Sequence, residues 1–372
     1  MEIELIMKKI NVNYQKSLVS VINSFIKYYG KKTYHNSLDI LDKELSKEYK
    51  HVVLMLLDGA GTKILKKNLS ENDFLNIKIV DRISSVFPPT TVAATTSVTT
   101  GLTPIEHGWL GWHLYLSHND PSLTLFTNLD YYQDIQYDKL NVKDVIGFEN
   151  FWDDLENIDT ADIYPSFKEN GYQTFSEALI ALKNRINKNH KTFTYFYWDN
   201  PDSLMHIEGT NTKNVKDLIK KMNDELEEFY HSLNEDTLIV IVADHGQIDI
   251  EPLYLYEYQD IIDCLDKLPS AEARSTIFHV KENKKEEFEI KFNQYFSNDY
   301  MLFNKKEILD LNIYGTGNPH HSTDISIGDY LAVSKTNKYF IFNSSSGIPF
   351  IGHHAGSTMD ELEVPLIILT KK

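Results

Sequence analysis

Residues 51–61 have the sequence HVVLMLLDGAG, which is the strongest local indication of the fold class. The run from His51 to Leu57 has the length and composition of a buried β-strand. Asp58 and Gly59 follow at once, and a glycine at such a point lets the backbone turn sharply. The pattern predicts a carboxylate at the carboxyl edge of a central sheet. A turn whose Asp caps the next helix is an alternative of about equal weight for this segment alone.

Three further runs have the same apolar character: Thr192 to Trp198, Thr237 to Ala243, and Val364 to Thr370. Segments with helical spacing lie between them, including Phe175 to Ile186 and Val215 to Leu233. Strands that alternate with helices predict an α/β fold with a mostly parallel central sheet and helices on both faces. In such sheets ligands gather at the carboxyl ends of the strands, so the residues that follow each run are candidates for function.

The region 251–342 differs in pattern from the rest of the chain. It contains short strand-like runs and one charged helical stretch, namely Ser275 to Val280, Lys284 to Phe296, Tyr300 to Phe303 and Tyr330 to Ser334. We predict that 251–342 forms an inserted α+β cap subdomain. Residues 1–250 and 343–372 would then form the main domain, to which the chain returns after the cap.

The chain is acidic, with 54 Asp and Glu against 37 Lys and Arg and a formal net charge of −17. Binding of a nucleic acid polymer depends on Lys and Arg displacing counterions from phosphates, so we expect no such partner. A small anionic substrate would need positive charge inside a pocket, and bound divalent cations are the strongest local source. The single cysteine, Cys264, excludes an intrachain disulfide and argues against redox catalysis.

No stretch approaches the roughly 18 to 20 uninterrupted apolar residues of a transmembrane helix. The segment 1–30 interrupts its apolar residues with Lys8, Lys9, Asn11 and Lys16, which is not typical of a signal peptide. We therefore expect a cytoplasmic protein without a membrane partner.

Carboxylates and imidazoles also follow the other strand-like runs. Asp202 and His206 are four residues apart, so one helical turn would place both on one face as ligands of a single metal. Asp244 and His245 directly follow the third run. Each signal is weak alone, because Asp202 and His206 would equally suit a surface ion pair or a helix cap.

A histidine pair, His353 and His354, precedes the last apolar run. Together, the strand ends offer three carboxylates and three imidazoles at four positions along the chain. A mixed oxygen and nitrogen set of this kind suits zinc or manganese better than calcium or an iron–sulfur centre.

The segment 84–101 is unusually rich in hydroxyl side chains, with seven Ser or Thr residues between Thr90 and Thr100. Pro88 and Pro89 prevent a helix from starting before Thr90. The plain interpretation is a loop followed by a helix whose Thr residues simply pack. The alternative is a hydroxyl nucleophile at a helix N-terminus, where backbone N–H groups and the helix dipole favour a phosphate.

Taken in order, these motifs resemble the alkaline phosphatase superfamily, and within it the type I phosphodiesterase/nucleotide pyrophosphatase family. The motifs are Asp58-Gly59, Phe87 to Thr91 leading to Thr100 to Gly108, Pro201-Asp202 with His206, Ala243 to Gly246, and His354 to Gly356. The resemblance spans about residues 52–369 and implies an alkaline-phosphatase-like fold with a catalytic main domain. Five motifs in the right order are far more specific than any one of them.

The resemblance implies hydrolysis of phosphodiester or pyrophosphate bonds, nucleotides included, through a phosphothreonine intermediate. Thr91 would be the nucleophile, since the counts from both flanking motifs lead to it. The cofactor would be two divalent metal ions, zinc with manganese as the alternative. The implied ligands are Asp202, His206 and His354 for one ion, and Asp58, Asp244, His245 and the Thr91 hydroxyl for the other. His354 is preferred because the family's histidine precedes a small-residue pair, and His353 is the fallback.

Two positions depart from the family pattern. Ala94 stands where the nucleotide pyrophosphatases have an Asn that binds a phosphate oxygen, and Thr90 stands where a Lys commonly precedes the nucleophile. Phosphate binding would then depend on the metals, on backbone N–H groups, or on Thr95 and Arg274. We name these last two as candidate substrate-binding residues.

Other interpretations stay open at this point. A phosphomonoesterase or phosphonate hydrolase would use the same metals and nucleophile, and a non-catalytic homologue would keep the metals as a structural clip. Trp109, Trp112 and Tyr115 would form a stacking wall for a flat leaving group, although packing in the core is favoured by about two to one.

Overall fold

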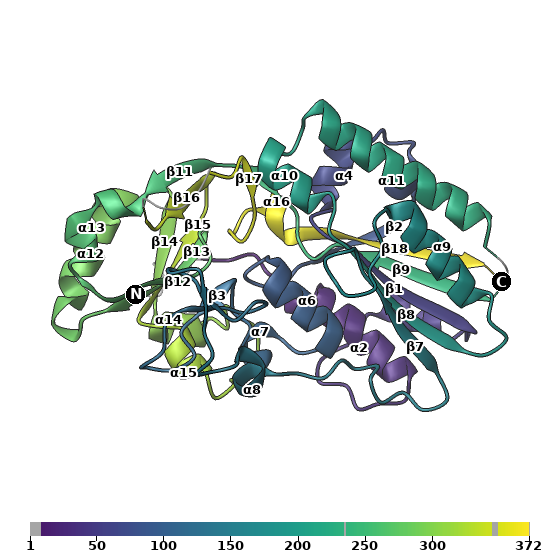
Figure 1. Cartoon of the computed structure of the whole chain (residues 1–372), viewed down its shortest axis with the longest axis horizontal. Coiled ribbons are helices and arrows are strands. Elements are labelled where there is room, and N and C mark those ends of the chain that lie inside the picture. The colour runs from purple at the N-terminus through teal and green to yellow at the C-terminus, as the bar shows by residue number, and fades with distance from the viewer. Residues whose placement is uncertain (1–8, 234–235, 344–348, 372) are drawn as a thin grey trace.

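The computed structural model describes residues 9–233, 236–343 and 349–371. The chain forms two lobes side by side, each built around its own sheet (Figure 1). Residues 1–8, which begin the segment tested above for a signal peptide, lie outside the described residues. Within the described part of the chain, no helix combines the length and the apolar character that a bilayer-spanning segment requires.

The main lobe contains a six-stranded sheet. In order across the sheet, its strands are β2 (Ile79–Ser84), β18 (Glu363–Lys371), β9 (Thr237–Val242), β1 (His51–Leu57), β8 (Thr192–Trp198) and β7 (Asp159–Ile163). The four strands β1, β7, β8 and β9 are parallel, whereas β18 runs antiparallel to both of its neighbours. The predicted α/β fold with a mostly parallel sheet is confirmed.

The register of the parallel strands brings their carboxyl ends to one edge. Leu57 pairs with Trp198 at the ends of β1 and β8, and Leu56 pairs with Val242 at the end of β9. Every residue of these three strands is buried, as expected for a parallel sheet covered on both faces. The polar residues that follow the three strands therefore emerge together.

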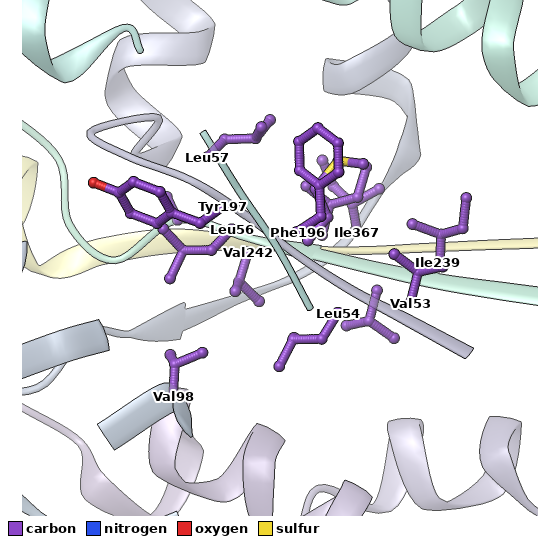
Figure 2. Close-up of a cluster of buried hydrophobic side chains, with 14 of the residues drawn as sticks. Val53, Leu54, Leu56, Leu57, Val98, Phe196, Tyr197, Ile239, Val242 and Ile367 are labelled. Carbon is purple, nitrogen blue, oxygen red and sulfur yellow. The ribbon is translucent and has the colours of Figure 1, made fainter. Parts of the chain in front are cut away.

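Helices cover both faces of this sheet. The helices α2 (Leu18–Tyr28) and α6 (Thr91–Thr100) lie on one face, and α4 (Thr62–Asn68), α9 (Phe175–Ile186) and α11 (Lys213–His231) on the other (Figure 1). Side chains of β1 alternate between the two faces. Figure 2 shows Leu54 and Leu56 on the side of Val98 from α6, with Leu57 on the opposite side.

The second lobe is built around an eight-stranded sheet. In order, its strands are β14 (Tyr300–Asn304), β15 (Tyr330–Ser334), β13 (Ser275–Val280), β12 (Leu265–Ala271), β3 (His113–Leu114), β4 (Leu123–Thr124), β5 (Leu129–Asp130) and β6 (Ile135–Gln136). The helix α13 (Lys285–Phe296) packs its Phe288 and Phe292 against Phe278 of β13. Since this sheet also takes in β3 to β6, the cap boundaries at 251–342 stay a prediction.

Short elements complete the two lobes. Two small sheets pair β10 (Ile248–Asp249) with β17 (Gly352–His353) and β11 (Glu251–Tyr254) with β16 (Lys338–Ile341). The remaining helices are η1 (Tyr14–Lys16), α3 (Asp39–Leu45), α5 (Phe74–Lys78), α7 (Pro104–His107), α8 (Val142–Ile146), α10 (Asp202–Glu208), η2 (Leu255–Glu257), α12 (Gln259–Ile262), η3 (Glu282–Lys284), α14 (Lys305–Asp310), α15 (Thr323–Ser326) and α16 (Met359–Leu362).

A buried ion pair ties the second lobe to the main lobe. Arg274, in the loop between β12 and β13, donates from Nε to Oε1 of Glu361 at 2.8 Å and from Nη2 to Oε2 at 2.9 Å. Neither side chain is exposed to solvent. Since Glu361 belongs to α16, which leads directly into β18, the pair connects the second lobe to the central sheet.

Candidate metal centre

Acidic residues converge where β1, β8 and β9 end. Asp58 follows β1, Asp244 follows β9 after one intervening residue, and Asp202 begins α10 after β8. Backbone hydrogen bonds hold these loops together, because the Asp202 N–H donates to the Asp58 carbonyl at 3.2 Å. Gly59 has a φ of +71°, and a Cβ built there would lie 2.8 Å from Cβ of Asp202. Glycine is therefore required for this close approach.

One group combines Asp58, Asp244 and His245. Nε2 of His245 lies 3.5 Å from Oδ1 of Asp58 and 3.4 Å from Oδ2 of Asp244. All three residues are buried, and one ligand atom from each falls within 4.8 Å of the others. The Gly59 N–H donates to Oδ1 of Asp244 at 3.0 Å, which leaves Oδ2 to face the histidine.

A second group forms around Asp202. As predicted from their spacing, Asp202 and His206 share one face of α10, with His206 Nε2 at 3.1 Å from Asp202 Oδ2. Nε2 of His354 lies 3.9 Å from Oδ1 of the same carboxylate. The other nitrogen of each ring contacts a backbone carbonyl. His206 Nδ1 lies 2.8 Å from the carbonyl oxygen of Gly352, and His354 Nδ1 lies 3.1 Å from that of Pro89. Such contacts orient metal-binding histidines in proteins.

The neighbouring His353 is oriented differently. Its Nδ1 accepts a hydrogen bond from the backbone N–H of His354 at 2.9 Å. A neutral imidazole whose Nδ1 accepts must carry its proton on Nε2, which then donates hydrogen bonds and is not available to a metal. One ring nitrogen of His353 does lie within 4.8 Å of a ring nitrogen of His206 and of one of His354. The contacts nevertheless favour His354 as the ligand, and the choice between the two stays a prediction.

Thr91 lies at the start of α6, beside the first group. Its Oγ1 is 3.4 Å from Oδ2 of Asp58 and 3.3 Å from Nε2 of His245. Thr90, the preceding residue, has an extended backbone with φ of −139°, so α6 begins at Thr91. The unpaired backbone N–H groups of a first helical turn provide donors for an anion at this point.

The chemistry of the cluster fits divalent cations. Asp58 Oδ1, Asp202 Oδ1 and Asp244 Oδ2 are buried without a hydrogen-bond partner among the described residues. Ion pairs within the same part of the chain bring no Lys or Arg to these three carboxylates. Burying unpaired carboxylates is costly, and bound cations would offset that cost. The oxygen and nitrogen donors suit zinc or manganese.

The pKa shifts at the cluster agree with this chemistry. Burial, with the neighbouring Asp244 and Asp202 carboxylates, raises the pKa of Asp58 well above its ordinary value. Burial also raises the pKa of Asp244. For His354, burial lowers the pKa well below its ordinary value, so the ring is neutral, as a metal ligand must be.

The two predicted substrate-binding residues lie in different surroundings. Thr95 is one turn along α6, and its Oγ1 donates to the Thr91 carbonyl at 2.6 Å. Arg274 is not part of the acidic cluster, because its guanidinium donates to Glu361 and to the carbonyls of Thr336 and Lys338. The contacts give no support to a role for Arg274 in substrate binding.

The three aromatic residues considered for a stacking wall divide between core and surface. Trp109 and Tyr115 are buried, which agrees with the favoured interpretation that they pack in the core. Trp112 is 42% exposed, and its ring packs edge-on against exposed Phe126 at a centroid distance of 5.9 Å.

Two residues of the site gave no sequence signal. The Tyr197 hydroxyl, from the buried strand β8, donates to Oδ2 of Asp58. Glu272, from the second lobe, accepts a hydrogen bond from Oγ1 of Thr90 at 2.7 Å. Burial raises the pKa of Glu272 to about 7. Both contacts join residues far apart in sequence, and neither residue belongs to a recognisable motif.

Comparisons with known proteins bear on both the family and the fold. The sequence profile of the type I phosphodiesterase/nucleotide pyrophosphatase family matches residues 52–354. No curated protein matches the chain. An inactive variant of murine ectonucleotide pyrophosphatase/phosphodiesterase 5, solved in complex with AMP, is 17% identical over 87% of this chain and 88% of its own, with a TM-score of 0.65.

Two further solved structures show the same likeness. Another structure of the murine protein is 18% identical over 86% of this chain and 88% of its own, with a TM-score of 0.65. The human protein is 16% identical over the same shares, 86% and 88%, with a TM-score of 0.62. These similarities show that the fold is alkaline-phosphatase-like. Because the family profile covers most of its length, the chain belongs to the type I phosphodiesterase/nucleotide pyrophosphatase family of phosphoric-ester hydrolases.

Proposed function

We propose that this chain hydrolyses phosphodiester or pyrophosphate bonds of small phosphorylated substrates, with Thr91 as the nucleophile and two divalent cations as cofactors. One observation carries the proposal. The Thr91 hydroxyl, at the first position of α6, lies 3.4 Å from the Asp58 carboxylate and 3.3 Å from the His245 imidazole.

The side chains that would hold the cations form two sets. Asp202, His206 and His354 would hold one, and Asp58, Asp244, His245 and the Thr91 hydroxyl the other. When bound, divalent cations supply positive charge that offsets the charge of the phosphate and lowers the pKa of a neighbouring hydroxyl or water. We propose zinc, with manganese as the alternative, on the basis of the mixed donor set.

The chain's own residues hold the nucleophile and the phosphoryl group in place. Hydrogen bonds from the Tyr197 hydroxyl to Asp58 and from the Gly59 N–H to Asp244 fix the two carboxylates beside Thr91. Backbone N–H groups of the first turn of α6 would bind the non-bridging phosphoryl oxygens, an arrangement that the helix dipole favours.

The reaction would proceed in two displacements at phosphorus. Thr91 Oγ1 forms a bond to phosphorus as the bond to the leaving oxygen breaks, which gives a phosphothreonine. Water then attacks the same phosphorus, the bond to Oγ1 breaks, and the Thr91 hydroxyl is restored. A covalent intermediate divides one difficult step into two easier ones.

Nucleotides are the substrate class that we propose. The AMP bound to the murine phosphodiesterase 5 variant supports this choice, since that protein shares the fold. The contacts to the nucleotide would differ in this chain, because Ala94 cannot provide the amide that the family's Asn provides.

Turnover of two chromogenic esters tests the proposal. Bis(p-nitrophenyl) phosphate and p-nitrophenyl phosphate would be compared with zinc- or manganese-loaded protein, with and without a chelator. We expect faster turnover of the diester and loss of activity with the chelator. Preferential turnover of the monoester would favour a phosphomonoesterase, and no turnover of either ester would favour a non-catalytic metal-binding protein.

A further inference from the structure

Glu272 is a buried acid that reaches from the second lobe to the nucleophile helix. It lies in the loop between β12 and β13 and is only 5% exposed. Its Oε1 accepts a hydrogen bond from Oγ1 of Thr90 at 2.7 Å. Since Thr90 directly precedes Thr91, this contact lies one residue away from the proposed nucleophile.

The loop that presents Glu272 is rigidly held within its own lobe. Ala271 has a φ of +74°, a conformation that is costly for a residue with a Cβ and persists only where the surroundings impose it. Gly111 packs against it so closely that a Cβ on this glycine would lie 2.9 Å from Cα of Ala271. The Thr276 hydroxyl also donates to the carbonyl of Glu272 at 2.7 Å. The second lobe therefore fixes the backbone from which the Glu272 side chain projects.

The contact changes what Thr90 does at the start of α6. A threonine at the N-cap position ordinarily accepts a hydrogen bond from the second or third N–H of its helix. Thr90 makes no such capping bond, because its hydroxyl is directed to Glu272. Within the described chain, no group accepts a hydrogen bond from the N–H groups of Thr91, Val92 or Ala93. These donors are left available for a ligand.

We propose that Glu272 is a positioning residue that turns the Thr90 hydroxyl away from α6 and so keeps the first-turn N–H groups free for the phosphoryl oxygens. Without this acceptor, the hydroxyl would rotate to cap the helix and would compete with the substrate for the same donors. The inference rests on the proposed function, in which Thr91 receives the phosphoryl group. It also makes the activity of the main lobe depend on a side chain of the second lobe.

Substitutions at Glu272 and Thr90 test this role. Glu272→Met keeps the side-chain length but removes the acceptor, and we expect kcat/KM for bis(p-nitrophenyl) phosphate to fall about tenfold or more. Glu272→Gln keeps an acceptor oxygen and should stay within about threefold of the unmodified chain. Thr90→Val removes the competing hydroxyl, so the double variant Glu272→Met with Thr90→Val should regain most of the activity that Glu272→Met loses. A merely structural contact would not give this recovery.

Binding of AMP provides a readout independent of turnover. In calorimetric titrations of the metal-loaded protein, Glu272→Met should weaken AMP binding by about tenfold, and addition of Thr90→Val should reverse the loss. The matched control is Glu225→Ala, which removes a carboxylate-to-hydroxyl contact of the same kind, with Ser176 at 2.6 Å between α9 and α11. This control should lower thermal stability without altering kcat/KM.

Two results would overturn the inference. Either Glu272→Met keeps its kcat/KM and its affinity for AMP, or the double variant is no more active than Glu272→Met. Failure of the proposed function looks different, since Thr91→Ala would then retain turnover whatever residue occupies position 272. If Glu272→Met does not fold, Glu272→Leu with and without Thr90→Val makes the same comparison, because leucine also lacks an acceptor.

Discussion

His354 directs its Nε2 atom towards Asp202, 3.9 Å from Oδ1, while its Nδ1 contacts the carbonyl of Pro89 at 3.1 Å. This orientation leads to a prediction that separates the two adjacent histidines. His354→Ala should reduce the metal content by about one ion per chain, measured by mass spectrometry of the purified protein after dialysis. His353→Ala should leave the metal content unchanged, because its Nδ1 already accepts a backbone hydrogen bond. The reverse pattern would make His353 the ligand.

Removal of the Thr91 hydroxyl should abolish turnover but not metal binding. Six of the seven proposed metal ligands remain in Thr91→Ala, so we expect metal content to persist while kcat falls on the order of 10³-fold or more. Thr99→Ala is the matched control, since Thr99 belongs to the same helix and its hydroxyl bonds to the carbonyl of Thr96 at 3.1 Å. A near-normal rate in Thr91→Ala would identify another nucleophile.

In the metal-free protein, the part of the free energy of unfolding that Asp58 and Asp244 contribute should decrease as the pH rises above about 4. Buried histidines such as His107 and His113, whose pKa values burial lowers to about 3, act in the opposite direction, so a comparison with a variant isolates this part. Burial raises the pKa values of Asp58 and Asp244 in the folded chain above the value of 3.8 that applies when they are exposed. At these two carboxyl groups the folded state therefore binds more protons than the unfolded state in this window, and the stabilisation that they provide is lost as the pH rises through the raised pKa values. Urea unfolding in the presence of a chelator measures the free energy of unfolding at pH 4.5 and at pH 7.

Asp58→Asn with Asp244→Asn is the control for that experiment. The double variant lacks both carboxylates, so its free energy of unfolding relative to that of the unmodified chain should be higher at pH 7 than at pH 4.5. A difference in stability between the two proteins that is the same at both pH values would contradict the assignment of the raised pKa values to this cluster.

The buried ion pair between the lobes should be costly to break from one side. Glu361→Gln leaves the buried Arg274 guanidinium without its counter-charge, so we expect a loss of about 3 to 5 kcal/mol in the free energy of unfolding. Asp217→Asn removes the partner of exposed Lys213 on α11 and should cost less than about 1 kcal/mol. Urea unfolding compares the two, and equal losses would show that burial does not set the strength of the pair.

The sequence predicted those elements whose burial is either continuous or regularly periodic along their length. β1, β8, β13 and α9 have the predicted bounds, because a continuous apolar run or a helical period marks each of them. The strands β2 and β7 were missed, since β2 carries the exposed Arg82 beside the half-buried Asp81 and β7 is short and mixed. The strands β3 to β6 have two residues each, which is too short for any periodicity.

The residues of the site are likewise of two kinds. Some are marked by a local sequence pattern, and others are brought to the site only by the tertiary structure. Asp58, Asp202, Asp244 and the two histidines near them, His206 and His245, could be named because each one follows a buried strand or lies one helical turn from one that does. Thr91 and His354 were named from the family's motifs. Tyr197 could not, since it reads as one more aromatic residue of an apolar strand. Glu272 could not either, because its contact with Thr90 spans 182 residues and depends on how the lobes pack.

The divided origin of the second sheet limits how this protein can be re-engineered. The short hairpins β3 to β6 join that sheet through the pairing of His113 with Ala271, although they precede the rest of it by more than a hundred residues. Excision of 251–342 as a single cassette would leave these strands with an uncovered edge, which is prone to aggregate. A chimera that exchanges this lobe with that of a homologue must therefore transplant two stretches of chain at once.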